Sequence, residues 1–467
     1  MSTTIEIPTT VADSGDNSWR GHIRATLTLG VPLIGAQLAQ LGIHTTDVVI
    51  LGQLGAQTLA AMVLAGQFLF TVLIFGSGFS IAVMPMVAQA YGRGDATSVR
   101  RSLRMGLWVA IVYWVLAQPL FWNAEAILLA FGQKPDVAAL AGNYVLIAEF
   151  GILPALLYNV FRALVSAIGK ASVILSVTIA MLALNALFAY ALVLGHFGLP
   201  ALGMTGAAIV SVAVQFAGLL FLIAYVESIE QTRKYELFVR FWRPDWKAFF
   251  EVVHLGLPIG ITVLAEVSLF SVASLLMGQI GTLQLAAHGI ALQLASISFM
   301  VPLGLSQAAT VRVGIAHGRG DLDGLIRASI TVMAIATLVA VFCGLLLFFW
   351  PTYFGSWFIN VDSADAAAVL GFAGPFIVVA GIFQLMDGLQ AIASGLLRGL
   401  KDARVPMILA LISYWPIGFL LAWVLAFPFG MGGIGIWIGF LIGLCAASVL
   451  LCGRFYLLVQ RHKEMAR

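Results

Sequence analysis

Charged side chains are scarce in this sequence. Only 10% of its 467 residues are Asp, Glu, Lys or Arg, whereas 61% are hydrophobic and the mean hydropathy is +1.02. A soluble domain carries about 25% charged residues, so this chain has too few to cover a surface that faces water. The composition excludes a soluble enzyme, a nucleic-acid-binding protein and a disordered protein. We therefore predict a polytopic membrane protein that has no nucleic-acid partner.

Cysteine is equally rare, and the motifs of common enzymes are missing. Cys343, Cys445 and Cys452 all lie in apolar stretches and offer neither a disulfide framework nor a zinc-binding spacing. Gly169-Lys170 lacks the upstream glycine of a phosphate-binding loop, and neither HExxH nor GxSxG occurs. We expect a protein that is not an enzyme, has no site for ATP hydrolysis and holds no resident cofactor.

Long apolar runs make up most of the chain. A helix needs about 20 apolar residues to cross the hydrocarbon core of a bilayer. The segment 1–19 is polar and lacks the apolar core of a signal peptide, so we expect a flexible tail there. For the remainder we predict an all-α fold of twelve transmembrane helices, near residues 25–51, 58–90, 104–122, 137–161, 172–194, 204–225, 247–277, 284–314, 328–350, 366–397, 405–427 and 433–458.

The basic residues gather in alternate loops. Arginines and lysines lie before span 1, after spans 2, 6, 8 and 10, and at the end of the chain, while the loops on the other side carry only Lys134. Basic residues are enriched in cytoplasmic loops. Both termini are therefore expected in the cytoplasm, with the chain in the inner membrane of a bacterium.

The two halves of the chain resemble each other. Residues 30–61 align with residues 256–287 at an offset of 226 without a gap, and Pro32 and Gln53 are among the residues that recur. Six spans separate the repeats, so both begin on the same side of the membrane. We predict two pseudo-symmetric six-helix lobes, an arrangement in which transporters bind substrate between the halves and alternate access to it.

The repeat sets the expected domains. We place the N-lobe at 20–226, a charged cytoplasmic linker at 227–247 and the C-lobe at 248–467. The string GRGD occurs at 92–95 and again at 318–321. We interpret it as local structure, because glycine ends a helix and aspartate favours the start of the next.

Four acidic residues lie deep in the predicted spans: Asp47, Glu149, Glu266 and Asp387. Charge at this depth costs about 2.5–3.5 kcal/mol and normally marks the path of an ion or substrate. No lysine or arginine occupies the central part of any span, so each acid is expected to hold a proton, a metal cation or a cationic ligand. The alternative is a neutral, hydrogen-bonded structural carboxyl, which we favour for Glu149 alone.

Helix geometry gives the depth of each acid. At about 1.5 Å per residue, Glu266 lies roughly 18 Å and Asp387 roughly 16 Å from the inner edge, so the two can face one another. Asp47 falls in the outer half of its helix. Glycine and proline interrupt several spans, as at 30–32 and 256–258. A broken helix leaves backbone carbonyls that can coordinate cations, whereas small residues also allow helices to pack closely. Close packing explains most of the glycines.

Four segments, 44–55, 256–272, 286–292 and 383–402, resemble multidrug and toxic compound extrusion transporters, most closely the NorM-like branch. The resemblance implies twelve helices in two lobes around a central cavity. It also implies antiport, in which an organic and often cationic compound leaves the cell as Na⁺ or H⁺ enters. We expect small-molecule organic cations and the lipid bilayer as partners, and a monomer.

The resemblance also assigns roles to residues. Asp47 looks like the acid of the first helix, and Glu266 and Asp387 look like the acid pair of the C-lobe that handles the coupling cation or metal ion. Expected substrate contacts are Gln40, Asn185, His288, Phe383 and Met386. Asn185 replaces the acid of the DinF-like branch. Phe383 stands where tyrosine is common and Gly289 where glutamine is common. His288 is either a proton relay or a hydrogen-bonded core histidine.

Three other classes of protein compete with this interpretation. A flippase or exporter for lipid-linked sugars or other endogenous metabolites could share the helical plan, but its cavity would need basic residues to hold phosphate. An intramembrane aspartyl protease needs a GxGD setting within the membrane, and the matching strings here lie in basic loops. A sensor or scaffold would need a soluble output domain, for which no segment is long enough.

Overall fold

Helices make up nearly all of the chain. The computed structural model describes residues 18–465 except 234, 240, 361 and 363, and the predicted tail lies almost entirely outside these residues. No strand occurs in the described part. Twelve helical segments are long and apolar enough to cross a membrane, so the number predicted from the sequence is confirmed.

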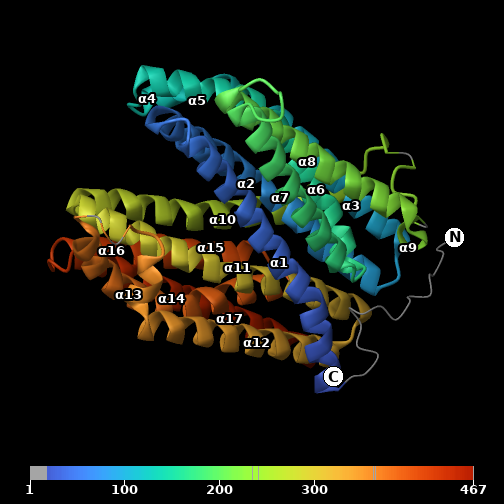
Figure 1. Cartoon of the computed structure of the whole chain (residues 1–467). Coiled ribbons are helices and arrows are strands. Elements are labelled where there is room, and N and C mark those ends of the chain that lie inside the picture. Colours follow the sequence, from blue (N-terminus) through green and yellow to red (C-terminus); the bar gives the residue numbers. More distant parts are fainter. Residues whose placement is uncertain (1–17, 234, 240, 361, 363, 466–467) are drawn as a thin grey trace. The chain divides into compact units, whose positions relative to one another are not determined.

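The helices follow one another with short connections (Figure 1). Their bounds are α1 (Trp19–Gly52), α2 (Ala56–Gly92), α3 (Ala96–Trp122), α4 (Ala124–Ala130), α5 (Pro135–Ala148), η1 (Glu149–Gly151), α6 (Ile152–Ala167), α7 (Ala171–Leu194), α8 (Gly203–Ser228), α9 (Glu230–Arg233), α10 (Trp246–Ile280), α11 (Thr282–Arg319), α12 (Leu322–Phe349), α13 (Pro351–Ser356), α14 (Ala366–Gly399), α15 (Arg404–Ile412), η2 (Ser413–Phe419), α16 (Leu420–Ala426) and α17 (Gly433–Met465).

Two of the predicted spans are not regular α-helices throughout. Span 4 contains the 3₁₀ turn η1, and span 11 contains the π-helical segment η2. Pro154 and Pro416 lie in or just after these segments, and neither has an N–H group for the carbonyl one turn earlier. Proline alone does not cause the irregularity, because Pro32 and Pro258 lie inside unbroken helices.

The described residues form two compact units. Residues 35–260 make up the first unit, and residues 18–34 together with 261–465 make up the second. The predicted lobes 20–226 and 248–467 differ from these units at both ends. The reason is that the beginning of α1 packs with the second unit and the beginning of α10 packs with the first. The two divisions, after positions 34 and 260, fall at equivalent positions of the repeat.

Glycines at equivalent positions make equivalent contacts in the two units. In the first unit, a Cβ atom on Gly78 of α2 would lie 2.4 Å from the nitrogen of Gly260 in α10. In the second unit, a Cβ on Gly304 of α11 would lie 2.7 Å from the Cα of Ile34 in α1. Only glycine allows such close approach of two helix backbones. The repeat in the sequence is therefore a repeat of helix packing.

The repeated GRGD strings are helix boundaries, as predicted. Asp95 caps α3 by accepting a hydrogen bond from the Ser98 nitrogen at 3.0 Å. Asp321 caps α12 in the same way, with the Gly324 nitrogen at 2.8 Å. The glycine before each aspartate adopts a left-handed conformation, with φ of 70° and 73°. Both strings thus end one helix and start the next.

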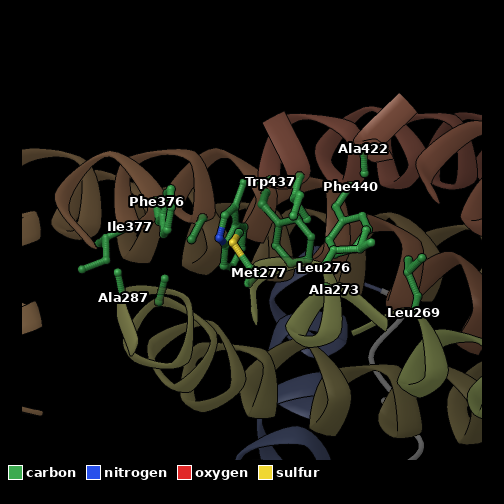
Figure 2. Packing of buried hydrophobic residues seen from close by; sticks show 14 of the residues in the cluster. Leu269, Ala273, Leu276, Met277, Ala287, Phe376, Ile377, Ala422, Trp437 and Phe440 are labelled. Carbon is green, nitrogen blue, oxygen red and sulfur yellow. The ribbon is translucent and has the colours of Figure 1, made fainter. Parts of the chain in front are cut away.

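Large aromatic side chains of α17 fill the centre of the second unit. Figure 2 shows Trp437 and Phe440 against Leu276 and Met277 of α10, with Phe376 of α14 in the same cluster. All five side chains are buried. Without a hydrophobic driving force in lipid, helices associate through tight packing of this kind.

Small residues bring α17 close to the segment formed by η2 and α16. Gly435, Gly439 and Gly443 recur at every fourth position along one face of α17. The Cβ atom that Gly439 lacks would lie 2.2 Å from the nitrogen of Ala422. Gly443 meets Gly418 of η2 in the same way. This contact fixes the position of η2, which also carries Tyr414.

We expect Gly439→Ala to destabilise the protein by about 1–3 kcal/mol, because the added methyl group must push α16 away. Thermal unfolding in detergent measures the effect. Gly453→Ala is the matched control, since its Cβ on the same helix would meet nothing within 4 Å. A Gly439→Ala variant that melts at the wild-type temperature would show that this contact does not hold the segment.

Candidate cation-binding sites

The second unit brings two of the predicted acids together. Glu266 lies on α10 and Asp387 on α14, and the two carboxylates are close enough to interact electrostatically. Asp387 is only 4% exposed, whereas Glu266 is partly accessible. The depths counted from the sequence predicted this meeting. Two neighbouring carboxylates in a low-dielectric setting repel each other, so they favour a shared proton or a bound cation.

Tyr414, which the sequence interpretation missed, connects this pair to α15–α16. Its hydroxyl hydrogen-bonds with Glu266 and accepts a hydrogen bond from the Nε2 atom of Gln390. It also interacts electrostatically with Asp387. We call Glu266, Asp387, Gln390 and Tyr414 the carboxylate site. Tyr414 lies in the π-helix η2, and π-helical turns are frequent at functional sites. In the sequence, Pro416 inside an apolar run was the sign that this span is not a regular α-helix.

Two oxygens of the carboxylate site have no donor. The Oδ1 atom of Asp387 and the Oε1 atom of Gln390 are buried and form no hydrogen bond within the described chain. Both residues lie on α14 one turn apart, so they share a face of the helix. An unsatisfied buried acceptor costs about 1–3 kcal/mol. A proton on Asp387, or a cation that prefers oxygen ligands, would remove this cost.

The donor set fits a monovalent ion or a proton better than a chelated metal. No group of three or more His, Cys, Asp or Glu side chains that could hold a metal ion occurs in the described part of the chain. A cation at the site would be held by Glu266 and Asp387 together with the neutral oxygens of Gln390 and Tyr414.

One expectation about these acids is wrong. We expected no basic partner, but Arg398 lies within electrostatic range of Glu266. Arg398 is close to the end of α14, and side chains on a helix point back toward its N-terminus. Its guanidinium also donates to the Ser306 hydroxyl at 2.8 Å and the Ser394 carbonyl at 3.2 Å. Arg398 thus compensates Glu266, while Asp387 has no basic group within electrostatic range among the described residues and can take one more positive charge.

The third predicted acid lies in the first unit. Asp47 of α1 is buried and accepts a hydrogen bond from the Nδ2 atom of Asn185 in α7 at 3.0 Å. Tyr144 of α5 interacts electrostatically with Asp47. The Oδ1 atom of Asn185 is buried without a donor in the described residues. This site therefore also combines a carboxylate with an unsatisfied amide oxygen.

Glu149 is held differently from the other three acids. Its carboxylate accepts a hydrogen bond from the Nε2 atom of Gln118 at 2.8 Å, and its backbone carbonyl accepts one from the indole of Trp114 at 3.3 Å. The side chain is buried in the first unit. These contacts support the structural role that we favoured for Glu149.

Two expected substrate contacts on α14 lie at different depths. Phe383 is 1% exposed and packs edge-on against Phe270 and Trp437, with ring centroids 6.0 and 5.7 Å away. Met386 is partly buried, and its sulfur accepts a hydrogen bond from Ser448 at 3.6 Å. In this structure Phe383 belongs to the core that supports the carboxylate site, and Met386 lies at the edge of that core.

The remaining expected contacts are divided between the two units. His288 is buried beside Trp437 in the second unit, and its Nε2 atom is 3.3 Å from the Ser274 hydroxyl. The contact fits the hydrogen-bonded core histidine that we considered as the alternative to a relay, while its Nδ1 atom is buried without a hydrogen-bond partner among the described residues. Gln40 is exposed, and Asn185 bonds Asp47 in the first unit.

Comparison with known proteins identifies the family. The MatE family model matches residues 32–191 and 258–424, two segments that begin at equivalent positions of the internal repeat. A probable multidrug resistance protein NorM from Agrobacterium fabrum is 66% identical over 454 residues, covering 97% of this chain and 98% of that protein. A protein of the same name from Rhizobium meliloti is 58% identical over 451 residues and 97% of both chains. The chain belongs to the MatE family.

A solved structure of low sequence identity shares the fold. The MOP superfamily transporter from Pyrococcus furiosus covers 99% of this chain and 99% of its own, with a TM-score of 0.86 and 17% identity. The family and the fold make this chain a multi-pass membrane transporter rather than an enzyme. The predicted fold, two six-helix lobes of a NorM-like MATE transporter, is confirmed.

We expect Tyr414→Phe to destabilise the protein by about 1–3 kcal/mol, since Gln390 and Glu266 would each lose a buried partner. Thermal unfolding in detergent measures this loss. Tyr456→Phe is the control, because that tyrosine on α17 is exposed. Equal melting temperatures for the two variants would mean that Tyr414 does not organise the carboxylate site.

Proposed function

We propose that this chain exports organic, often cationic compounds across the membrane in exchange for Na⁺ or H⁺. The observation that carries the proposal is the carboxylate site, where Glu266 and Asp387 are close, only partly compensated by Arg398 and left with unsatisfied oxygens. The names of the relatives, probable multidrug resistance proteins, support multidrug efflux as the activity.

Competition for negative charge couples the two fluxes in this proposal. A proton or Na⁺ that occupies the carboxylate site neutralises Asp387 and Glu266 and lowers the affinity for a cationic drug. Its departure restores the charge. A ligand shifts a conformational equilibrium only through different affinities for the two states, so exchange of ligands would drive alternating access between the lobes. One elementary charge moving through 100 mV supplies about 2.3 kcal/mol.

The orientation follows from the basic loops. We infer that both termini lie in the cytoplasm of a bacterium and that the protein acts in the inner membrane as a monomer. The arginines at 100, 101 and 104 and at 243, and those at 398 and 454, would then all lie on the cytoplasmic side.

Flipping or export of a lipid-linked or other endogenous metabolite is the alternative function. The transporter from Pyrococcus furiosus is described as having a binding pocket of reverse polarity that suggests a different function, so the shared fold alone does not decide the substrate. The acidic character of the carboxylate site and of Asp47 favours cations here. A basic lining would be needed to hold phosphate.

We expect Asp387→Asn and Glu266→Gln to abolish cation-driven efflux while the protein still folds, since each change removes one of the two competing charges. The measurement is export of a fluorescent organic cation from proteoliposomes, with a Na⁺ gradient and a pH gradient imposed separately. The gradient that drives export identifies the coupling ion.

Glu149→Gln is the matched control, because Glu149 is also a buried acid within a span but accepts a hydrogen bond from Gln118. It is expected to retain transport close to the wild-type rate. Wild-type transport by Asp387→Asn and Glu266→Gln would remove the carboxylate site from the mechanism. Loss of transport in Glu149→Gln alone would place the coupling charge in the first unit instead.

A further inference from the structure

A basic pocket lies in the first unit, and neither Asp47 nor Glu149 is among the residues that line it. It has a volume of about 660 Å³ and is formed by the beginning of α3 and the segment between α9 and α10 (Figure 1). Four guanidinium groups and two carboxylates line it: Arg100, Arg101, Arg104, Arg243, Glu236 and Asp245. The proposed transport cycle gives no role to this pocket.

The two acids compensate only part of the positive charge. Glu236 pairs with Arg100 at 3.3 Å, and Asp245 pairs with Arg101. The hydrogen bond from Arg101 lowers the pKa of Asp245, so this carboxylate stays charged. Arg104 is buried and lies within electrostatic range of Arg100 and Arg243, which carry the same charge, and of Asp245. Asp95 and Glu251 lie within electrostatic range of Arg101 but do not line the pocket. A pocket with this excess of guanidinium groups favours an anion.

Exposed aromatic residues place the pocket at a membrane surface. Trp246 lines the pocket at the start of α10 and is 64% exposed, and Trp242 is 78% exposed. Tryptophan is enriched where the bilayer meets water. Trp108 of α3 donates a hydrogen bond to the Phe241 carbonyl at 3.0 Å and stacks on its ring, which holds this segment against α3. At such a surface, the phosphate of a lipid headgroup is the anion that we expect beside the pocket.

The arginine cluster is not a by-product of the internal repeat. At the equivalent positions of the second repeat, Ile326 replaces Arg100 and Ile330 replaces Arg104. Only Arg101 has a basic counterpart there. By contrast, Gly78 and Gly304, which serve packing, are glycine in both repeats. The charges of this pocket are therefore a feature of the first unit alone.

We propose that the basic pocket binds the phosphate headgroup of an anionic phospholipid from the adjacent leaflet. A guanidinium group can donate two parallel hydrogen bonds to two oxygens of a phosphate. Basic pockets beside transmembrane helices bind anionic lipid headgroups. The exposed rings of Trp242 and Trp246 would lie at the level of the headgroups, while Arg243 and Arg104 contact the phosphate.

Native mass spectrometry of the full chain with added phosphatidylglycerol or phosphatidylcholine tests the proposal. We expect the wild type to retain phosphatidylglycerol in preference to phosphatidylcholine. Arg243→Gln, at an exposed position that should not disturb folding, is expected to reduce this preference about fivefold. The double variant Arg100→Gln with Arg243→Gln should reduce it further, and Arg243→Lys should keep most of it.

Arg24→Gln is the matched control, since Arg24 is an exposed basic residue outside the pocket. It should leave the lipid preference unchanged. An unchanged preference in Arg243→Gln and in the double variant would overturn the proposal. Inorganic phosphate is the second probe: if it binds the lipid-free protein through Arg243 and phosphatidylglycerol does not displace it, the pocket is a site for soluble anions and the proposal is wrong.

Discussion

Two neighbouring carboxylates, of which only Glu266 has a guanidinium within electrostatic range in the described part of the chain, are the constraint around which the polar groups of the second unit are arranged. Glu266 and Asp387 cannot both stay ionised at low cost unless a positive charge joins them, and Arg398 supplies only part of it. The surrounding contacts hold the acids in place rather than neutralise them. Gln390 donates a hydrogen bond to the Tyr414 hydroxyl, which also hydrogen-bonds with Glu266. Tyr414 belongs to the same buried cluster as Trp437 and Phe440 of α17, and this packing holds it in position. The carboxylate site would therefore bind a cation more strongly when both carboxylates are ionised.

The internal repeat builds the scaffold but not the charges. Gly78 and Gly304 make equivalent contacts, and Asp95 and Asp321 are equivalent helix caps. The acids follow no such rule. In the alignment of the two repeats, Glu266 corresponds to Gln40 and Asp47 corresponds to Ala273. Duplication thus explains why the two units pack alike, while each unit carries its own arrangement of polar groups. In the first unit Asn185 holds Asp47, and in the second Tyr414 holds Glu266.

The sequence predicted the helices well because length and hydropathy decide which segments can cross a bilayer. It also indicated that Glu266 and Asp387 can face one another, since counting residues along each helix places both acids at a similar depth. It could not predict Tyr414, whose position depends on the π-helical turn, or the reach of Arg398, which depends on a side-chain rotamer. The division within α1 was missed because it reflects which helix packs on which. Phe383 was expected to contact substrate, and its burial in this structure depends on neighbours from α10 and α17, which the sequence could not give.

The most direct test of the account is to count the ions that leave when an organic cation binds. Purified protein in weakly buffered detergent solution would be titrated with a fluorescent cation while pH and free Na⁺ are recorded. The account predicts release of a proton or a Na⁺ ion from the wild type and a clear loss of this release in Asp387→Asn. Tight binding of the organic cation to the wild type with no release of either ion would contradict it.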